Sequence, residues 1–196
     1  MPKVVDADER RQVIAEATLR VIAREGVESA TLGRVAAEAG LAVGSVRHYV
    51  PTHGEVLATA MERLVERVNA RVLAVASAEN PTRGADVLAE LLPLDDRRRE
   101  EAAVWLALAG ASRFQAELEP FFVQLHRGTR ELVRVVLTHA QESGRLGPGE
   151  TVLAVETERL AALLDGLALG AVTRPESLSP DVLAAVLARH LDRLGP

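Results

Sequence analysis

Residues 31–50 have the sequence TLGRVAAEAGLAVGSVRHYV. Thr31 is a residue type that favours helix N-caps, and the pattern after it predicts a short helix over 32–39 that Gly40 ends. A two-residue turn follows, and then a second short helix is predicted over 43–49. Two short helices that meet at a turn containing glycine are typical of a helix-turn-helix motif.

The spacing of small and branched residues in this segment fits the same motif. Ala36 is small enough for the second helix to cross closely, and Gly40 can adopt the left-handed backbone that the turn needs. Val46 would pack back into the angle between the helices, in a small core with Val35, Ala39 and Leu41. An αα-hairpin that does not bind DNA has a similar pattern, so the spacing alone leaves both interpretations open.

The remainder of the chain is predicted to be helical. Apolar residues recur at helical spacing, and cap or turn residues separate the segments. Asn80-Pro81 is a linker signal, and no segment is a convincing strand, so the predicted fold class is all-α. Besides those named above, the predicted helices cover residues 6–25, 53–76, 82–92, 95–108, 121–142, 151–172 and 180–191.

The composition excludes several kinds of protein. The chain has no cysteine, which excludes disulfides, a thiol nucleophile and cysteine-ligated zinc or iron–sulfur sites. No run of about 18 apolar residues occurs, so we expect no membrane span. The polar N-terminal segment is unlike a secretion signal, and we therefore expect a cytoplasmic protein.

The sequence also lacks the common signatures of enzymes. There is no Glu-x-x-His, no His-Glu-x-x-His, no Gly-x-Ser-x-Gly and no glycine-rich phosphate loop. The five histidines do not show metal-ligand spacing, and the charged run 95–101 is interpreted as a solvated helix start. We therefore expect no metal, no cofactor and no enzymatic activity.

The charge distribution limits how this chain could bind DNA. Residues 1–55 hold seven basic and eight acidic side chains, and the whole chain has a net charge of −5. Without a basic surface, phosphate contacts would have to come from a few placed groups and from helix N-termini.

The segment TLGRVAAEAGLAVGSVRHYVPTHGEVL (31–57), between a first helix and a long later one, resembles the TetR family of bacterial transcriptional regulators. GSVRHYV (44–50) is similar to the GSLRHYF of a BetI-like branch, and LLPLDDRRREEAAVWLALAG (91–110) and LLDGLAL (163–169) resemble the C-terminal domain of that branch. The resemblance implies a three-helix, helix-turn-helix DNA-binding domain (1–52) and a helical-bundle domain for ligand binding and dimerisation (53–196).

The same resemblance implies a function and roles for individual residues. The chain would be a homodimeric, ligand-responsive regulator, most simply a repressor that a small-molecule effector releases from a palindromic double-stranded DNA operator. Arg47 and His48 on the recognition helix would contact base edges, while Thr31, Arg34, Thr52 and others would contact phosphates. The expected DNA-binding residues are Thr31, Arg34, Val43, Gly44, Ser45, Arg47, His48, Tyr49, Thr52 and His53.

The middle helices would hold the ligand. The candidate pocket residues are Trp105, Phe114, Phe122, His126 and Asp165. Core packing is the simpler interpretation for any one of the aromatic residues. Asp165, a carboxylate in an apolar run, could have a structural role or meet a polar ligand group. A helical small-molecule-binding protein that does not bind DNA is the alternative function. Buried or scattered side chains at the expected DNA contacts would favour that alternative.

The last two predicted helices are the candidate dimer interface. The first of these helices has an apolar stripe of Leu160, Leu163, Leu164 and Leu167, and the second has a stripe of Leu183, Val186, Leu187, Leu191 and Leu194. Two copies could join these stripes into a four-helix bundle, or both stripes could face the core of their own chain. The leucines expected at the interface are Leu160, Leu164, Leu167, Leu183, Leu187 and Leu191.

Overall fold

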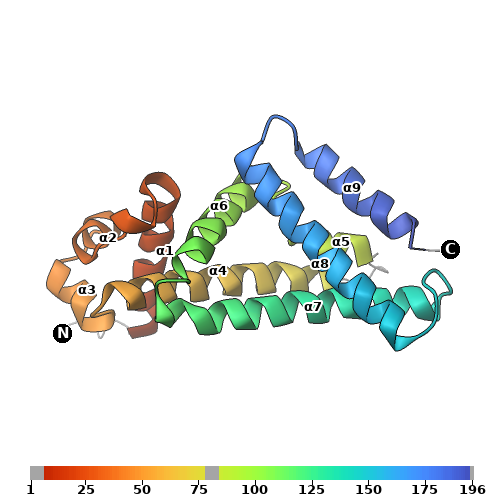
Figure 1. Cartoon of the computed structure of the whole chain (residues 1–196). Helices are drawn as coiled ribbons and strands as arrows, with labels where there is room; N and C mark the ends of the chain where they lie inside the picture. The colour runs from red at the N-terminus through yellow and green to blue at the C-terminus, as the bar shows by residue number, and fades with distance from the viewer. Residues whose placement is uncertain (1–6, 78–83, 195–196) are drawn as a thin grey trace. The chain divides into compact units, whose positions relative to one another are not determined.

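The structure is a computed structural model that describes residues 7–77 and 84–194. These residues form α-helices and two 3-10 helices without a strand (Figure 1), which confirms the all-α prediction. The linker signal at Asn80-Pro81 lies outside the described residues. The elements are α1 (Ala7–Glu25), η1 (Val27–Ser29), α2 (Leu32–Ala39), α3 (Val43–Tyr49), α4 (His53–Ala76), α5 (Gly84–Ala89), α6 (Asp96–Ala111), η2 (Ala116–Leu118), α7 (Glu119–Glu142), α8 (Glu150–Thr173) and α9 (Pro180–Asp192).

Caps and breakers place most of the helix ends where the sequence predicts them. Ser179 caps α9 by accepting a hydrogen bond from the Val182 N–H, with Pro180 at the first position of the helix. The sequence predicts that α7 begins after Pro120, at residue 121. In the structure α7 begins at Glu119, and Pro120 lies in its first turn. A proline is tolerated there because the N–H group that it lacks would have no partner within the helix.

The chain divides into two compact units. One comprises Met1–Arg67 with Ala103–Val123, and the other comprises Val68–Ala102 with Gln124–Pro196. The unit that holds the helix-turn-helix is therefore larger than the segment 1–52 expected as a domain, because the first half of α4 and the segment from α6 to the start of α7 join it.

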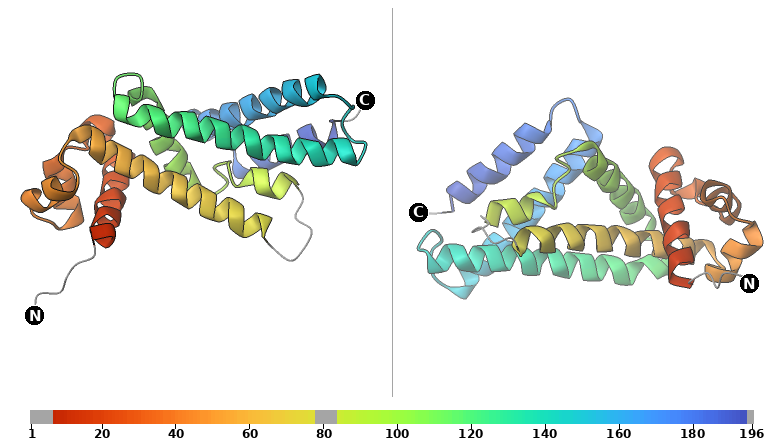
Figure 2. Two further views of the ribbon diagram at one scale, coloured as in Figure 1. Left: turned by 90° about the horizontal axis from the view of Figure 1, so that it is seen from below. Right: turned by 180° about the vertical axis from the view of Figure 1, so that it is seen from behind.

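In the first unit, α1, α2 and α3 contact one another and form a three-helix group (Figure 1). Ile14 and Val21 of α1, Val35 of α2 and Val46 of α3 are fully buried. In the second unit, α9 contacts both α5 and α8, and the two views of Figure 2 show α5 beside α9. The core of that unit is rich in leucine, and it includes Leu88, Val133, Leu137, Leu160 and Leu183.

Candidate nucleic-acid interface

Helix α2 and the turn after it have the geometry that the sequence predicts. The Thr31 side chain accepts a hydrogen bond from the Arg34 N–H (3.2 Å), so Thr31 is the N-cap. Gly40 adopts the left-handed conformation (φ 67°), and the Leu41 N–H donates to the Ala36 carbonyl (2.9 Å) in a Schellman pattern. This turn fixes the direction in which α3 leaves α2.

The angle between α2 and α3 is filled by the predicted core. Val35, Ala36 and Val46 are at most 1% exposed, and Val50 is also buried. The predicted packing of this motif is confirmed, although Ala39 and Leu41 are only half-buried. Because Val46 and Val50 are one helical turn apart, they define the side of α3 that faces the protein.

The opposite side of α3 is open to solvent. Gly44 and His48 lie about 160° around the helix from Val46, and both are exposed. Arg47 is exposed and forms no ion pair or hydrogen bond with any described residue. Ser45 and Tyr49 are half-buried, and the rings of His48 and Tyr49 meet edge to face with centroids 5.0 Å apart.

Helix α4 begins beside α3 with a capping box. The Glu55 N–H donates to the Thr52 hydroxyl (3.1 Å), and the Thr52 N–H donates to the Glu55 carboxylate (3.0 Å). Thr52 itself is exposed. His53 is half-buried, and its Nε2 atom is buried without a hydrogen-bond partner among the described residues. That atom is therefore turned away from a phosphate contact of the kind expected for His53.

The other arginines near the motif are held by carboxylates. Arg20 (2.8 Å) and Arg24 bind Glu38, and the Nε atom of Arg34 donates to Glu25 (3.0 Å). The hydrogen bond from Arg34 lowers the pKa of Glu25, and those from Arg20 and then Arg24 lower the pKa of Glu38. A phosphate contact from the Arg34 guanidinium would require its ion pairs to open.

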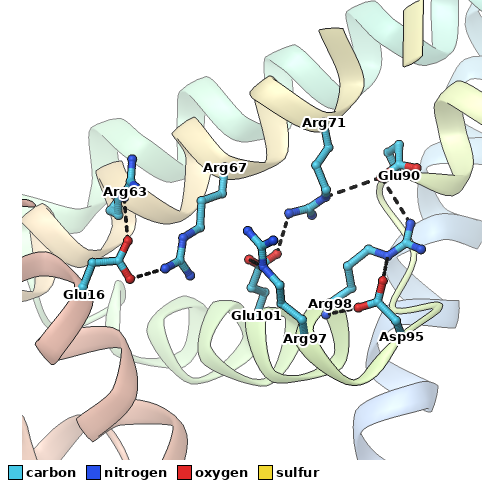
Figure 3. A network of polar contacts seen from close by, with 9 residues as sticks. All are labelled: Glu16, Arg63, Arg67, Arg71, Glu90, Asp95, Arg97, Arg98 and Glu101. Carbon is cyan, nitrogen blue, oxygen red and sulfur yellow. Dashed lines mark hydrogen bonds and ion pairs between the residues drawn. The ribbon is translucent and has the colours of Figure 1, made fainter. Parts of the chain in front are cut away.

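A second group of ion pairs joins α1 to α4. Glu16 binds Arg63 (2.8 Å) and Arg67, which lie one turn apart on α4 (Figure 3). Partial burial opposes ionisation of Glu16, but the hydrogen bonds from Arg63 and Arg67 lower its pKa overall. This clamp supports the helix group that carries α3, and sequence inspection did not single it out because Glu16 lies 47 residues from Arg63.

Six of the expected DNA contacts carry a hydroxyl, guanidinium or imidazole group on or beside α3 or at the N-cap of α2, and none of these six side chains is buried. Thr31, Arg47, His48 and Thr52 are exposed. Ser45 and Tyr49 are half-buried. This combination of a rigid turn, an apolar inner side and an open polar outer side is what a recognition helix needs in order to enter a DNA groove.

Comparisons with known proteins agree with this geometry. The C-terminal family model of BetI-type transcriptional repressors matches residues 81–196. The HTH-type transcriptional regulator PksA of Bacillus subtilis (strain 168) is 35% identical over 196 residues, which cover 99% of this chain and 94% of PksA. The chain belongs to the TetR family of transcriptional regulators. It is therefore a DNA-binding regulator, and the alternative without DNA binding is not favoured.

Solved structures of TetR-family fold extend this likeness over almost the whole chain. A transcriptional regulator from Rhodococcus sp. Rha1 has a TM-score of 0.81 and 29% identity, covering 94% of this chain and 95% of its own. A regulator from Saccharomonospora viridis, solved in complex with choline, has a TM-score of 0.80 and 22% identity, covering 94% and 96%. The second likeness shows a shared fold. No described helix of this TetR-family chain is long and apolar enough to cross a membrane.

The residues expected in the ligand pocket of this TetR-family regulator fall into both units. In the first unit, Trp105 is half-buried and Phe122 is buried. Phe114 is 86% exposed, so the prediction that it lines a pocket is wrong. It follows the end of α6, where the chain turns toward η2, and no neighbouring element covers it.

In the second unit, His126 and Asp165 belong to a polar group on α7 and α8. Arg130 binds Glu158 with two hydrogen bonds of 2.7 Å, and its Nη1 atom is 3.2 Å from the His126 Nδ1. Asp165 is half-buried and has no hydrogen bond to a described residue. Burial raises the pKa of Asp165, and the charges of His126 and Arg130 oppose that rise.

The run 95–101, expected to be solvated, contains a buried carboxylate. Asp95 is exposed and caps α6 by accepting a hydrogen bond from the Arg98 N–H (2.7 Å). Glu101 is only 7% exposed and binds Arg71 of α4 (2.8 Å), so the expectation is wrong at that position. Figure 3 shows this ion pair together with Glu90, which lies near both Arg71 and Arg98.

The leucines expected at the dimer interface are buried inside a single chain. The prediction that these leucines form the interface is wrong for all six, because each is at most 8% exposed and belongs to the core of the second unit. They are Leu160, Leu164, Leu167, Leu183, Leu187 and Leu191. A side chain that already packs in its own core has little surface to offer a second copy. These six leucines therefore face inward.

A different side of α8 and α9, next to the side that carries these six leucines, is open to solvent. A groove of about 500 Å³ lies there, with an apolar part made by Leu163, Val186 and Leu194. Its polar lining is Glu156, Arg159, Arg189, His190 and Arg193. Burial lowers the pKa of His190, and the charge of Arg159 adds to that effect. Sequence inspection missed the polar lining because arginine on a helix is usually a solvated residue.

Proposed function

We propose that two copies of this regulator bind a near-palindromic duplex operator, each through α3, and that a small-molecule effector releases them and so relieves repression. The observation that carries the proposal is Arg47, which is exposed on a flank of α3 and engaged by no described residue. Such a DNA-binding repressor would act in the cytoplasm, and the proposal involves no catalysis, metal or resident cofactor.

The contacts follow from the chemistry of the exposed groups. Arg47 would donate two hydrogen bonds to the N7 and O6 atoms of a guanine, and His48 would meet a neighbouring base edge. The hydroxyl oxygens of Thr31 and Thr52 already accept backbone hydrogen bonds, which leaves each O–H free to donate to a phosphate. Because Arg34 is held by carboxylates and the His53 Nε2 is buried, we give these two residues a lesser role.

The dimer would form through the open side of α8 and α9 around Leu163, Val186 and Leu194. TetR-family regulators usually form dimers, and a two-fold operator requires two recognition helices related by a two-fold axis. An apolar groove that is open in the single chain supports this choice, since a second copy would remove it from water.

The effector would meet Asp165. A half-buried carboxylate without a hydrogen-bond partner is costly, and a bound cation would offset that cost. The Saccharomonospora viridis protein of the same fold was solved with choline, which carries a positive charge. A positively charged effector is therefore the class that we favour.

The proposal is tested by selecting bound sequences from random duplex DNA with the full-length protein. We expect enrichment of an inverted repeat that binds at least about 1,000-fold more tightly than a scrambled duplex at the same salt concentration. Enrichment of no sequence, or of a sequence without two-fold symmetry, would contradict it.

A further inference from the structure

The first turn of α3 presents an apolar surface to solvent. Val43 is 42% exposed. Among the described residues of α1, α2 and α3, no other large hydrophobic side chain is exposed. Ala42, at the N-cap, is exposed and makes no side-chain cap hydrogen bond. Since Val46 and Val50 already fill the inner side of the helix, Val43 is left outside the core.

The neighbours of Val43 place it on the surface assigned to DNA. Val43 and Arg47 are four residues apart, so their side chains lie next to each other on one flank of α3, about 5–6 Å apart at Cβ. Gly44 lies beside Val43 on the outermost side of the helix. A Cβ atom at Gly44 would meet nothing within 4 Å in the free chain, so a glycine is not required by packing within the protein. A bare backbone at that point lets an external group approach the first turn closely.

We propose that Val43, with Ala42, packs against the 5-methyl group of a thymine in each operator half-site, within about two base-pair steps of the guanine that Arg47 contacts. This inference rests on the proposed role of α3 in binding the operator. In the major groove thymine is the base that carries a methyl group, so an apolar contact at this position distinguishes T·A from the other pairs. Both apolar surfaces leave water when they meet, which stabilises the complex.

The test uses deoxyuridine, which differs from thymidine by that methyl group. Each thymine of the selected operator is replaced in turn by uracil, symmetrically in both half-sites, and the affinity of the full-length protein is measured at fixed salt. At one thymine position we expect a loss of about fourfold per half-site, or about fifteenfold for the duplex. Val43→Ala should bind the thymine and uracil duplexes equally, within about twofold.

The matched control is Val123→Ala, which truncates another exposed valine of the same unit on α7 and should keep the full sensitivity to the methyl group. The inference is overturned if uracil has no effect at any thymine, or if Val43→Ala remains as sensitive as the wild type. Either result, with a palindromic operator still bound, would leave the proposed function standing. A wild-type protein that selects no DNA sequence would overturn both.

Discussion

Single arginines near the helix-turn-helix differ in what surrounds them. Arg20, Arg24 and Arg34 are each bound to Glu25 or Glu38, whereas Arg47 has no described partner. An ion pair on the protein surface must be broken before its arginine can bind DNA, so the free arginine is the better base contact. The structure thus separates residues that the sequence could only group together by charge.

Replacing Arg47 by alanine is expected to weaken operator binding by about 1–3 kcal/mol, because a bidentate contact to guanine is lost. Gel shifts at fixed salt measure the affinity. Arg113→Ala is the matched control, since Arg113 is exposed in the same unit but lies after α6. Thermal unfolding should be unchanged in both variants, and an unchanged affinity of the Arg47 variant would remove this residue from the interface.

Gly40→Ala is expected to destabilise the protein by about 1–2 kcal/mol, because a Cβ atom is unfavourable at the left-handed φ of 67°. Urea unfolding followed by circular dichroism measures the loss. Gly33→Ala serves as the control, since Gly33 is exposed in the first turn of α2, has no positive φ and has free space around its Cβ position, so alanine is tolerated there. Equal stability of the two variants would show that the turn does not need a glycine.

Asp165→Asn is expected to raise the unfolding temperature at pH 7. Burial raises the pKa of Asp165 in the folded chain, so an ionised carboxylate at this position opposes folding above that pKa. The penalty is relieved as the pH falls through the raised pKa, and the two proteins should converge in stability near the ordinary pKa of aspartate.

Asp192→Asn on α9 is the control for this prediction, because Asp192 is exposed and the substitution should change the unfolding temperature little at either pH. A stability difference between wild type and Asp165→Asn that does not depend on pH would argue against a charge effect at Asp165.

At the level of helices, the sequence predicts where a helix begins and ends better than it predicts which of its faces is buried. The bounds of α2, α3 and α4 follow from caps, a glycine turn and a capping box, all of which are local signals. The inward face of α8 does not follow in the same way, because Leu163 and Leu164 are adjacent and only Leu164 is in the core. Periodicity places residues in a stripe without showing which neighbour covers it.

Two further errors have the same origin. An aromatic side chain usually packs in a core or a pocket, but Phe114 lies beyond the end of α6, where nothing covers it. Glu101 is buried because Arg71, thirty residues earlier, lies beside it. Contacts between residues far apart in the chain depend on how the helices pack, and a single sequence does not contain that information in readable form.

Val186→Glu is expected to dissociate the proposed dimer while the chain stays folded, because Val186 is half-buried and lines the open groove of α8 and α9. Sedimentation measures the dimer, and circular dichroism measures the fold. Val135→Glu, on an exposed position of α7, should leave the dimer intact.

Leu187→Glu should behave differently from Val186→Glu, although the two residues are adjacent. Leu187 is 2% exposed, and a buried, unpaired charge is strongly destabilising, so this variant should unfold. An intact dimer of Val186→Glu would move the interface away from this groove.

For the whole molecule, repression and release require a difference in free energy between two states. An effector with equal affinity for the operator-bound and free states would release nothing, however tightly it bound. A tenfold loss of operator affinity requires about 1.4 kcal/mol of coupling, and the operator must weaken effector binding by the same factor. Trp105 is the one tryptophan of the chain and could report effector binding by its fluorescence.

The central claim is that two copies of α3 bind symmetric half-sites, and hydroxyl-radical footprinting of the full-length protein on its selected operator tests it most directly. We predict two protected regions of equal extent, related by a two-fold axis and centred about one helical turn apart or a multiple of it. We also predict that both disappear together in Arg47→Ala at the same protein concentration. A single protected region, or protection that Arg47→Ala leaves unchanged, would contradict the account.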